Sequence, residues 1–217
     1  ARARAPARAA AEAETGSLVA GGIEFAPPFS EAAIQKAMPP SELNGMSLSR
    51  KAYDDACEAG MNVQINVEMA ASMMYLAMSQ YFARDNVALP GLAHYFMKES
   101  KEEREHAEML MEYQVMRGGR VILGPLGAPP SEFDNAEKGD ALHAASLALS
   151  LEKLNMDKLL ELHAIADEAN DCQLVDFLEG DLLRPQAESI DEAARMVTKL
   201  DRVGKGHGTW AFDRTLE

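Results

Sequence analysis

The heptapeptide EEREHAE at residues 102–108 decides the fold, because it places acids and a histidine inside an apolar helical repeat. The flanking stretches, LAHYFM and MLMEYQVM, are apolar and helix-forming. Steps of alternating three and four residues trace one stripe through Leu92, Phe96, Glu99, Glu103, His106, Leu110 and Tyr113. Glu103 and His106 therefore lie in the middle of a predicted core face.

Three other segments repeat this pattern, each with a polar side chain near the centre of its apolar stripe. These are Glu68 and Tyr75 in residues 53–83, Glu152 in residues 138–167, and Gln186 in residues 173–203. The helix that carries EEREHAE is expected to span residues 90–117. Four helices are thus predicted to direct polar groups toward a shared axis.

Buried carboxylates need compensation. An isolated one costs several kcal/mol, and a group of them would repel one another. Bound cations would relieve this repulsion, and carboxylates with one imidazole suit iron or manganese better than structural zinc. The alternative is a structural polar cluster in which Arg104 or a lysine neutralises the acids.

The connection GRVILGPLGAPPSEFDNAE at residues 119–137 predicts how these helices are joined. It has no helical period, and loops of this length are unusual in compact domains. A helix of about 28 residues is roughly 42 Å long, whereas about 19 extended residues reach roughly 60 Å. The segment can therefore cross the whole bundle. We expect an all-α four-helix bundle of two antiparallel pairs with one long crossover, and a short fifth helix at residues 209–216.

Composition narrows the class of partner. The hydrophobic fraction of 47% suits one sizeable core, and the net charge is −14 with no basic cluster beyond the first eight residues. These features disfavour nucleic acid and anionic membranes and favour cations. The apolar run at residues 69–83 is too short to span a bilayer. Only Cys57 and Cys172 are present, so we expect no disulfide framework and a reducing compartment.

The N-terminal part differs in composition from the bundle. Residues 1–17 are rich in arginine and alanine, with no acid before Glu12. They are interpreted as a disordered tail or as the remnant of an organelle transit peptide. Residues 18–48 contain two Pro-Pro pairs and are expected to form an extended arm with one short helix at residues 31–36.

Several separated stretches resemble ferritin in both order and spacing, over residues 49–217. They are INVEMAASMMYLAM, EEREHAEMLMEYQVMRGGR, LSLEKLN, LLELHAIADEANDCQLVDFLE and GKGHGTWAFD. FAPPF and SRKAYDDACEAGMNVQINVE are most similar to plastid ferritins of plants and green algae, in which an N-terminal extension precedes the bundle. The resemblance implies a ferritin-like bundle and a plastid location, with the cytoplasm as the alternative.

The resemblance also implies a function. It predicts an iron-storage subunit with ferroxidase activity, which oxidises Fe²⁺ with dioxygen at two iron sites per subunit. Ferric mineral would collect inside a closed shell of roughly two dozen subunits. Two irons supply two electrons together, so dioxygen can become peroxide without release of superoxide.

The family's functional residues transfer to matching positions here. Glu68, Glu103 and His106 match the first iron site, with Glu103 bridging; Glu152 and Gln186 match the second, and Tyr75 lies beside them. Asp176 and Glu179 match the three-fold entry channel, with His163 near its approach, and Glu102, Glu105 and Glu108 match the mineral-nucleating cavity surface. From the residues alone, the channel acids could instead favour the positive end of a helix, and the last three could form a solvated charged face.

Other functions on the same bundle remain as alternatives. A storage subunit without oxidase chemistry is disfavoured by the complete set of acids and histidine. A di-iron oxygenase would need a second Glu-x-x-His, whereas this chain has Gln186-Ala-Glu-Ser189. A DNA-protecting mini-ferritin is disfavoured by the fifth helix and the acidic charge. Pro185, inside the last long helix, predicts a kink or a lost hydrogen bond next to Gln186.

Overall fold

The structure is a computed structural model that describes residues 18–20, 23–25, 30–40 and 44–216. The predictions for residues 1–17 lie outside the described residues. The chain divides into two units, residues 1–46 and 47–217, each considered by itself.

The first unit contains short elements. Strands β1 (Leu18–Ala20) and β2 (Ile23–Phe25) pair in antiparallel fashion, with Val19 opposite Glu24. Helix α1 (Glu31–Ala37) begins at Ser30, whose hydroxyl accepts a hydrogen bond from the backbone of Ala33. The sequence predicted α1 within one residue but missed the strands, because three-residue strands are too short to show an alternating pattern.

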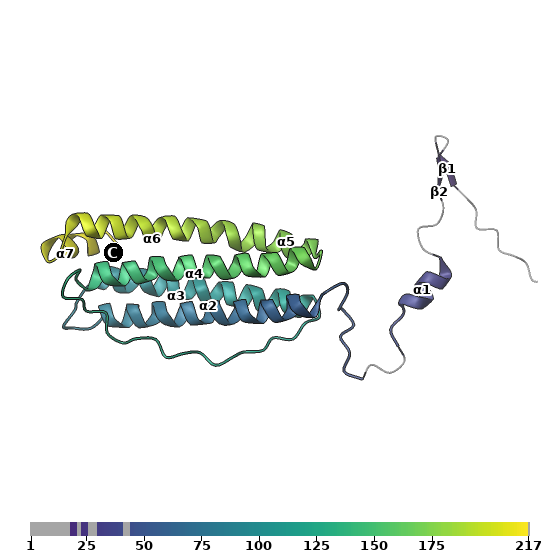
Figure 1. Cartoon of the computed structure of the whole chain (residues 1–217), viewed down its shortest axis with the longest axis horizontal. Coiled ribbons are helices and arrows are strands. Elements are labelled where there is room, and N and C mark those ends of the chain that lie inside the picture. Colours follow the sequence, from purple (N-terminus) through teal and green to yellow (C-terminus); the bar gives the residue numbers. More distant parts are fainter. Residues whose placement is uncertain (1–17, 21–22, 26–29, 41–43, 217) are drawn as a thin grey trace, which may run out of the picture. The chain divides into compact units, whose positions relative to one another are not determined.

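The second unit is a bundle of long helices (Figure 1). Its elements are α2 (Asp55–Phe82), α3 (Pro90–Met116), α4 (Asp140–Glu168), α5 (Cys172–Phe177), the π-helix η1 (Leu178–Leu183), α6 (Arg184–Val203) and α7 (His207–Asp213). Helix α2 packs along α3 and α4, and α4 also packs along α6. The predicted four-helix bundle with a short C-terminal helix is confirmed, and α7 begins two residues earlier than expected.

Local chemistry sets the ends of the first two long helices. The Asp54 carboxylate caps α2 by accepting a hydrogen bond from the backbone of Ala56 at 2.8 Å. Pro90 occupies the first turn of α3, where its missing N–H costs nothing. After α3, Gly118 has φ +79°, and a Cβ there would lie 2.4 Å from Oγ of Ser47. Only glycine fits this close turn.

The long connection after α3 runs along α2 from one end to the other, as Figure 1 shows. Near the N-terminal end of α2, Asn62 Oδ1 accepts a hydrogen bond from Ile122 N at 2.8 Å. Beyond the C-terminal end, Arg84 donates to Glu132, and Phe133 is buried against Tyr81. These contacts confirm the crossover. They also explain why α4 begins at the same end of the bundle as α3.

The core has two apolar clusters. One includes Met78, Phe82, Leu92 and Phe96 near the α2–α3 turn. The other, toward the start of α2, includes Met61, Ile65, Leu110, Leu159 and Leu174. Ile65, Leu92, Phe96 and Leu110 are all fully buried, which confirms the predicted stripes. Polar side chains occupy the space between the clusters.

The sequence predicts a helix over residues 173–203 with a kink or a lost hydrogen bond at Pro185, and the structure is irregular just before this proline, at residues 178–183. This stretch is the π-helix η1, and Pro185 follows it in the first turn of α6. Proline lacks an N–H and its ring clashes with the carbonyl four residues earlier. A π-turn accommodates this defect by widening the helix locally. Leu182 and Gln186 consequently both remain buried, at 2% and 3% exposure.

Both cysteines are free: Cys57 is buried and Cys172 is exposed. Among the described residues, no helix combines the length and the apolar character needed to cross a membrane.

Candidate metal centre

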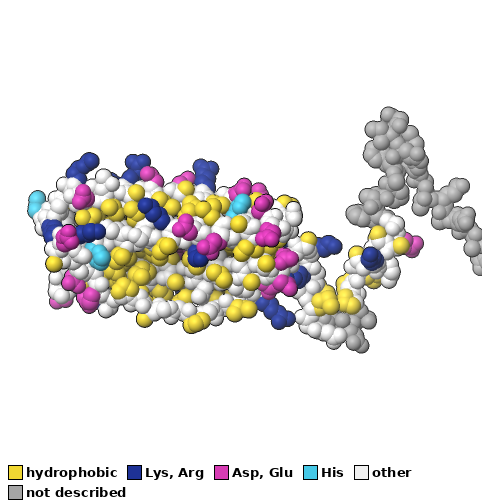
Figure 2. Space-filling model, viewed as in Figure 1, with side chains coloured by type: hydrophobic (Ala, Val, Ile, Leu, Met, Phe, Trp, Pro, Cys, Tyr) yellow, Lys and Arg dark blue, Asp and Glu magenta, His cyan; other side chains and the backbone are white. Residues whose placement is uncertain are grey.

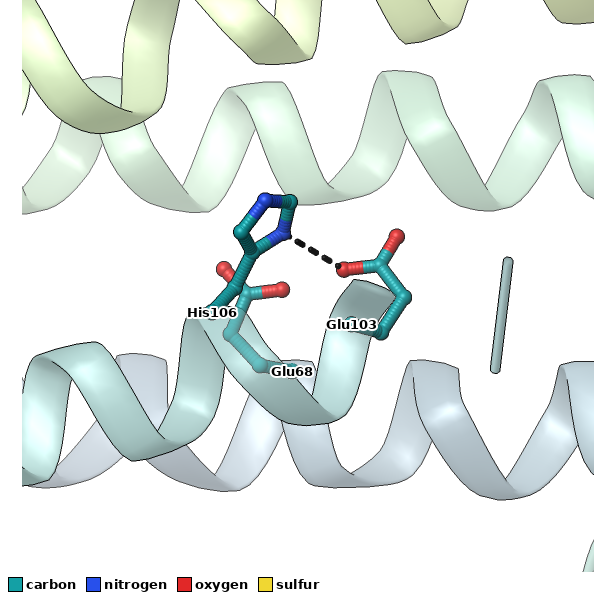
Figure 3. Close-up of side chains that lie close together, drawn as sticks. All are labelled: Glu68, Glu103 and His106. Carbon is teal, nitrogen blue, oxygen red and sulfur yellow. Dashed lines mark hydrogen bonds and ion pairs between the residues drawn. The ribbon is translucent and has the colours of Figure 1, made fainter. Parts of the chain in front are cut away.

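Glu68, Glu103 and His106 lie together in the middle of the bundle (Figure 3). Glu68 comes from α2, whereas Glu103 and His106 are one turn apart on α3. One possible ligand atom from each residue lies within 4.8 Å of the others. His106 Nδ1 is 3.3 Å from Glu103 Oε2. Three residues predicted to form one site are therefore brought together with spacing that suits a single metal ion.

Glu152, Gln186 and Tyr75 form the adjoining part of the centre. Glu152 on α4 and Gln186 on α6 are buried, and Gln186 Nε2 donates to the Glu152 carboxylate and, at 3.1 Å, to its backbone oxygen. The Tyr75 hydroxyl donates to the other carboxylate oxygen of Glu152. Helices α2, α3, α4 and α6 thus each contribute at least one residue to one polar centre.

Burial makes this centre a strong attractor for protons or cations. Loss of solvation raises the pKa of Glu68, and repulsion by Glu103 raises it further. Burial likewise raises the pKa of Glu103 and that of Glu152. Without metal, these raised pKa values favour the protonated forms of the acids more than in exposed carboxyl groups. A metal ion that displaced these protons would restore the charge balance.

The alternative of a cluster neutralised by Arg104 is wrong. Arg104 Nε lies 2.9 Å from Glu108 Oε1, and both side chains are exposed. Lys98 pairs with Glu99 and Glu102. Within the part of the chain that the structure describes, no lysine or arginine forms an ion pair with Glu68, Glu103 or Glu152.

Sequence reasoning missed three buried polar residues. Gln64 and Asn155, each 1% exposed, donate hydrogen bonds to Glu68. Amides at core positions carry no charge pattern, and only their three-dimensional neighbours reveal a role. Glu99, one turn before Glu103, appeared in the predicted stripe but was assigned no role. Burial raises its pKa to about 7.

The predicted channel residues form a second, more exposed group. His163 Nε2 on α4 is 2.9 Å from Glu179 Oε1 on η1. Asp176 and Glu179 are exposed and line one surface depression together with Cys172. The acids are thus accessible from outside this chain.

The predicted nucleation residues lie along α3. Glu102 is half-buried, and Glu105 and Glu108 are exposed. Glu102 and Glu105 line a depression of about 520 Å³ that His106 also lines. His106 is thus the residue of the centre that borders this depression.

The chain is similar to known proteins over most of its length. A family model described as "Ferritin-like domain" matches residues 58–203. Ferritin-3, chloroplastic, of Arabidopsis thaliana is 51% identical over 97% of this chain and 81% of its own length. The protein of the same name from Vigna unguiculata is 57% identical over 79% of this chain and 67% of its own.

A solved structure is similar over nearly its whole length. The ferritin of the multicellular green alga Ulva pertusa has a TM-score of 0.82 and 49% identity, covering 87% of this chain and 98% of that one.

Proposed function

Because this chain belongs to the ferritin family, we propose that it stores iron and that its buried centre is a ferroxidase site. Fe²⁺ and dioxygen are the substrates. Each of two Fe²⁺ ions loses one electron, and dioxygen takes up both electrons with two protons to give hydrogen peroxide. The ferric product would then leave the centre and enter a mineral store.

The observation that carries this proposal is the convergence of Glu68, Glu103 and His106 without a neutralising lysine or arginine. Oxygen ligands with one imidazole suit iron, which must be held loosely enough to pass on. Glu103 interacts electrostatically with both Glu68 and Glu152. A carboxylate in this position is suited to bridge two metals about 3.5–4 Å apart.

Glu152 and Gln186 would hold the second iron. The amide of Gln186 is neutral, so the centre offers three carboxylates to two Fe²⁺ ions. This charge deficit favours release of the product over permanent binding. Tyr75 donates to Glu152 and holds the carboxylate in place.

We propose that the chain assembles with copies of itself into a shell of about 24 subunits. Figure 2 shows hydrophobic side chains between the charged ones on the bundle surface. Val63 on α2 and Ile122 and Leu123 in the crossover are more than half exposed, at 56%, 65% and 64%. Apolar groups gathered in this way are typical of an interaction surface.

The exposed acids would bind iron ions in this shell. Asp176 and Glu179, with His163 beside them, would be repeated around a symmetry axis and attract Fe²⁺ by the accumulated negative charge. Glu102, Glu105 and Glu108 would collect ferric ions on the inner surface. The chloroplastic relatives support a plastid location.

Two measurements on the purified chain test the proposal: native mass, and oxygen consumption on addition of Fe²⁺. We expect a closed shell that consumes about one dioxygen for every two Fe²⁺ in the first rapid phase. Glu103→Ala should assemble but lose this phase. Glu112→Ala, an exposed acid on the same helix, is the matched control and should behave like the parent. A shell that takes up iron without this phase would support storage without oxidase chemistry.

A further inference from the structure

Two buried amides form hydrogen bonds with residues of the metal centre. Gln64 on α2 and Asn155 on α4 are each 1% exposed, and neither belongs to the proposed ligand set. Buried amides are costly unless their hydrogen bonds are satisfied. Their partners therefore show what they stabilise.

Asn155 contacts ligands from both halves of the centre. Its Nδ2 donates to Glu68 Oε2 at 2.8 Å and to Gln186 Oε1 at 3.2 Å. Glu68 belongs to the proposed first iron site and Gln186 to the second. One nitrogen atom on α4 thus fixes the separation between a ligand on α2 and a ligand on α6.

Gln64 fixes the orientation of Asn155. Gln64 Nε2 donates to Glu68 Oε1 at 2.7 Å and to Asn155 Oδ1 at 2.7 Å. Asn155 must therefore turn its oxygen toward Gln64 and its nitrogen toward the two ligands. Reversing either amide would place oxygen against oxygen, so the acceptors around the pair permit one arrangement.

This arrangement leaves one buried oxygen of Gln64, Oε1, without a hydrogen bond from the described residues. An unsatisfied buried acceptor is unfavourable. Packing alone would favour an apolar side chain here. The amide is explained by its two donated bonds, which hold Glu68 and orient Asn155.

We propose that Asn155, oriented by Gln64, is a positioning residue that couples the two iron sites. The inference rests on the proposed ferroxidase function and deepens it. Asn155 holds Glu68 Oε2 and Gln186 Oε1 at one spacing before metal arrives, so the second ion meets a ligand already in place. Without it, Gln186 keeps its contacts with Glu152, and Glu68 keeps its contacts with Gln64 and Glu103 but loses the link to Gln186.

Binding of a redox-inert metal tests this coupling separately from oxidation. Zn²⁺ is titrated into the metal-free assembled protein by calorimetry, and the Glu103→Ala titration is subtracted to remove ions bound outside the centre. The parent should bind two Zn²⁺ per chain at the centre. In Asn155→Leu the first should bind as in the parent, through Glu103 and His106, and the second roughly 10–100-fold more weakly, as is common when supporting contacts are lost.

The matched control is Gln114→Leu. Gln114 is a fully buried amide on α3 that contacts Tyr53, Glu58 and Arg120 but no residue of the centre. It should lower stability without weakening the second Zn²⁺. Asn155→Ala replaces Asn155→Leu if the larger side chain prevents assembly.

The outcomes separate the two proposals. A parent that binds fewer than two Zn²⁺ at the centre overturns the ferroxidase proposal and this inference with it. The inference alone is overturned if the parent binds two Zn²⁺ and the assembled Asn155 variants hold the second Zn²⁺ within twofold of the parent. It is also overturned if their second Zn²⁺ is weakened no more than in Gln114→Leu.

Discussion

The hydroxyl of Tyr75 on α2 donates a hydrogen bond to Oε1 of Glu152 on α4. The ring of Tyr75 lies in the apolar cluster beside Phe96, with ring centroids 6.1 Å apart, so the residue joins the core to the metal centre. Hydrogen bonding to the ionised carboxylate lowers the pKa of Glu152 and opposes the larger effect of burial. Tyr75 therefore helps to keep Glu152 ready for a cation.

Tyr75→Phe should weaken the second metal more at low pH than at high pH. Without the donor, the pKa of Glu152 rises, and protons compete with the metal over a wider range. We expect a several-fold loss of Zn²⁺ affinity at pH 6 that shrinks at pH 8. Tyr81→Phe, a buried tyrosine in the same cluster, is the control. An equal loss at both pH values would indicate that Tyr75 acts through packing.

Glu103→Gln should make the metal-free protein less sensitive to alkaline pH. Burial raises the pKa of Glu103 above its ordinary 4.5. A carboxyl group whose pKa is raised on folding contributes stability at low pH that is lost as the pH rises through the folded value. The parent should therefore lose stability from pH 5 to pH 8, and Glu103→Gln should lose less.

Urea unfolding of the metal-free protein at both pH values measures this difference. We expect Glu103→Gln to exceed the parent by on the order of 1–3 kcal/mol at pH 8, with little difference at pH 5. A variant that is less stable than the parent at pH 8 would mean that Glu103 is compensated without metal.

Asp176→Asn with Glu179→Gln should slow iron entry. The two acids are exposed, and their attraction for Fe²⁺ in the shell is expected to act at a distance and to be screened by salt. Initial oxidation at low Fe²⁺ should fall in the double variant, and the parental rate should fall toward it as salt is added. The control pair is Glu161→Gln with Asp157→Asn, which changes two exposed acids on a different helix, α4. Equal rates for the channel variant and the parent at every Fe²⁺ concentration would remove the entry role.

Gln186→Glu with Ser189→His should convert a site that releases iron after oxidation into a site that retains it. The new pair adds a fourth carboxylate and a second imidazole, three residues apart on α6. We expect the second ion to bind at least roughly 10–100-fold more tightly, to survive desalting, and to slow repeated turnover. Ser189 is half-buried and donates to the backbone oxygen of Pro185 at 3.2 Å, so histidine must displace that contact. A correctly folded variant that binds iron no more tightly than the parent would contradict the hypothesis that Gln186 and Ser189 favour release of iron.

The sequence by itself determined the helices and the residues that meet at the centre. Apolar stripes in α2, α3, α4 and α6 predict which side chains face inward, because helical geometry repeats with a fixed period. Glu68, Glu103, His106 and Glu152 interrupt those stripes. An interruption of this kind is visible without coordinates. The length of the crossover likewise predicts the topology from reach alone.

Only the tertiary structure decided how those residues are supported. The π-turn before Pro185 depends on the packing that keeps Leu182 and Gln186 buried together, and a proline in sequence predicts disruption without showing how it is absorbed. Gln64 and Asn155 are 91 positions apart and acquire a role only because α2 and α4 bring their amides within 2.7 Å. Helical periodicity specifies which face of a single helix is buried. A hydrogen bond between two helices also requires their relative shift and rotation to bring donor and acceptor together, and only the packing of the helices decides these.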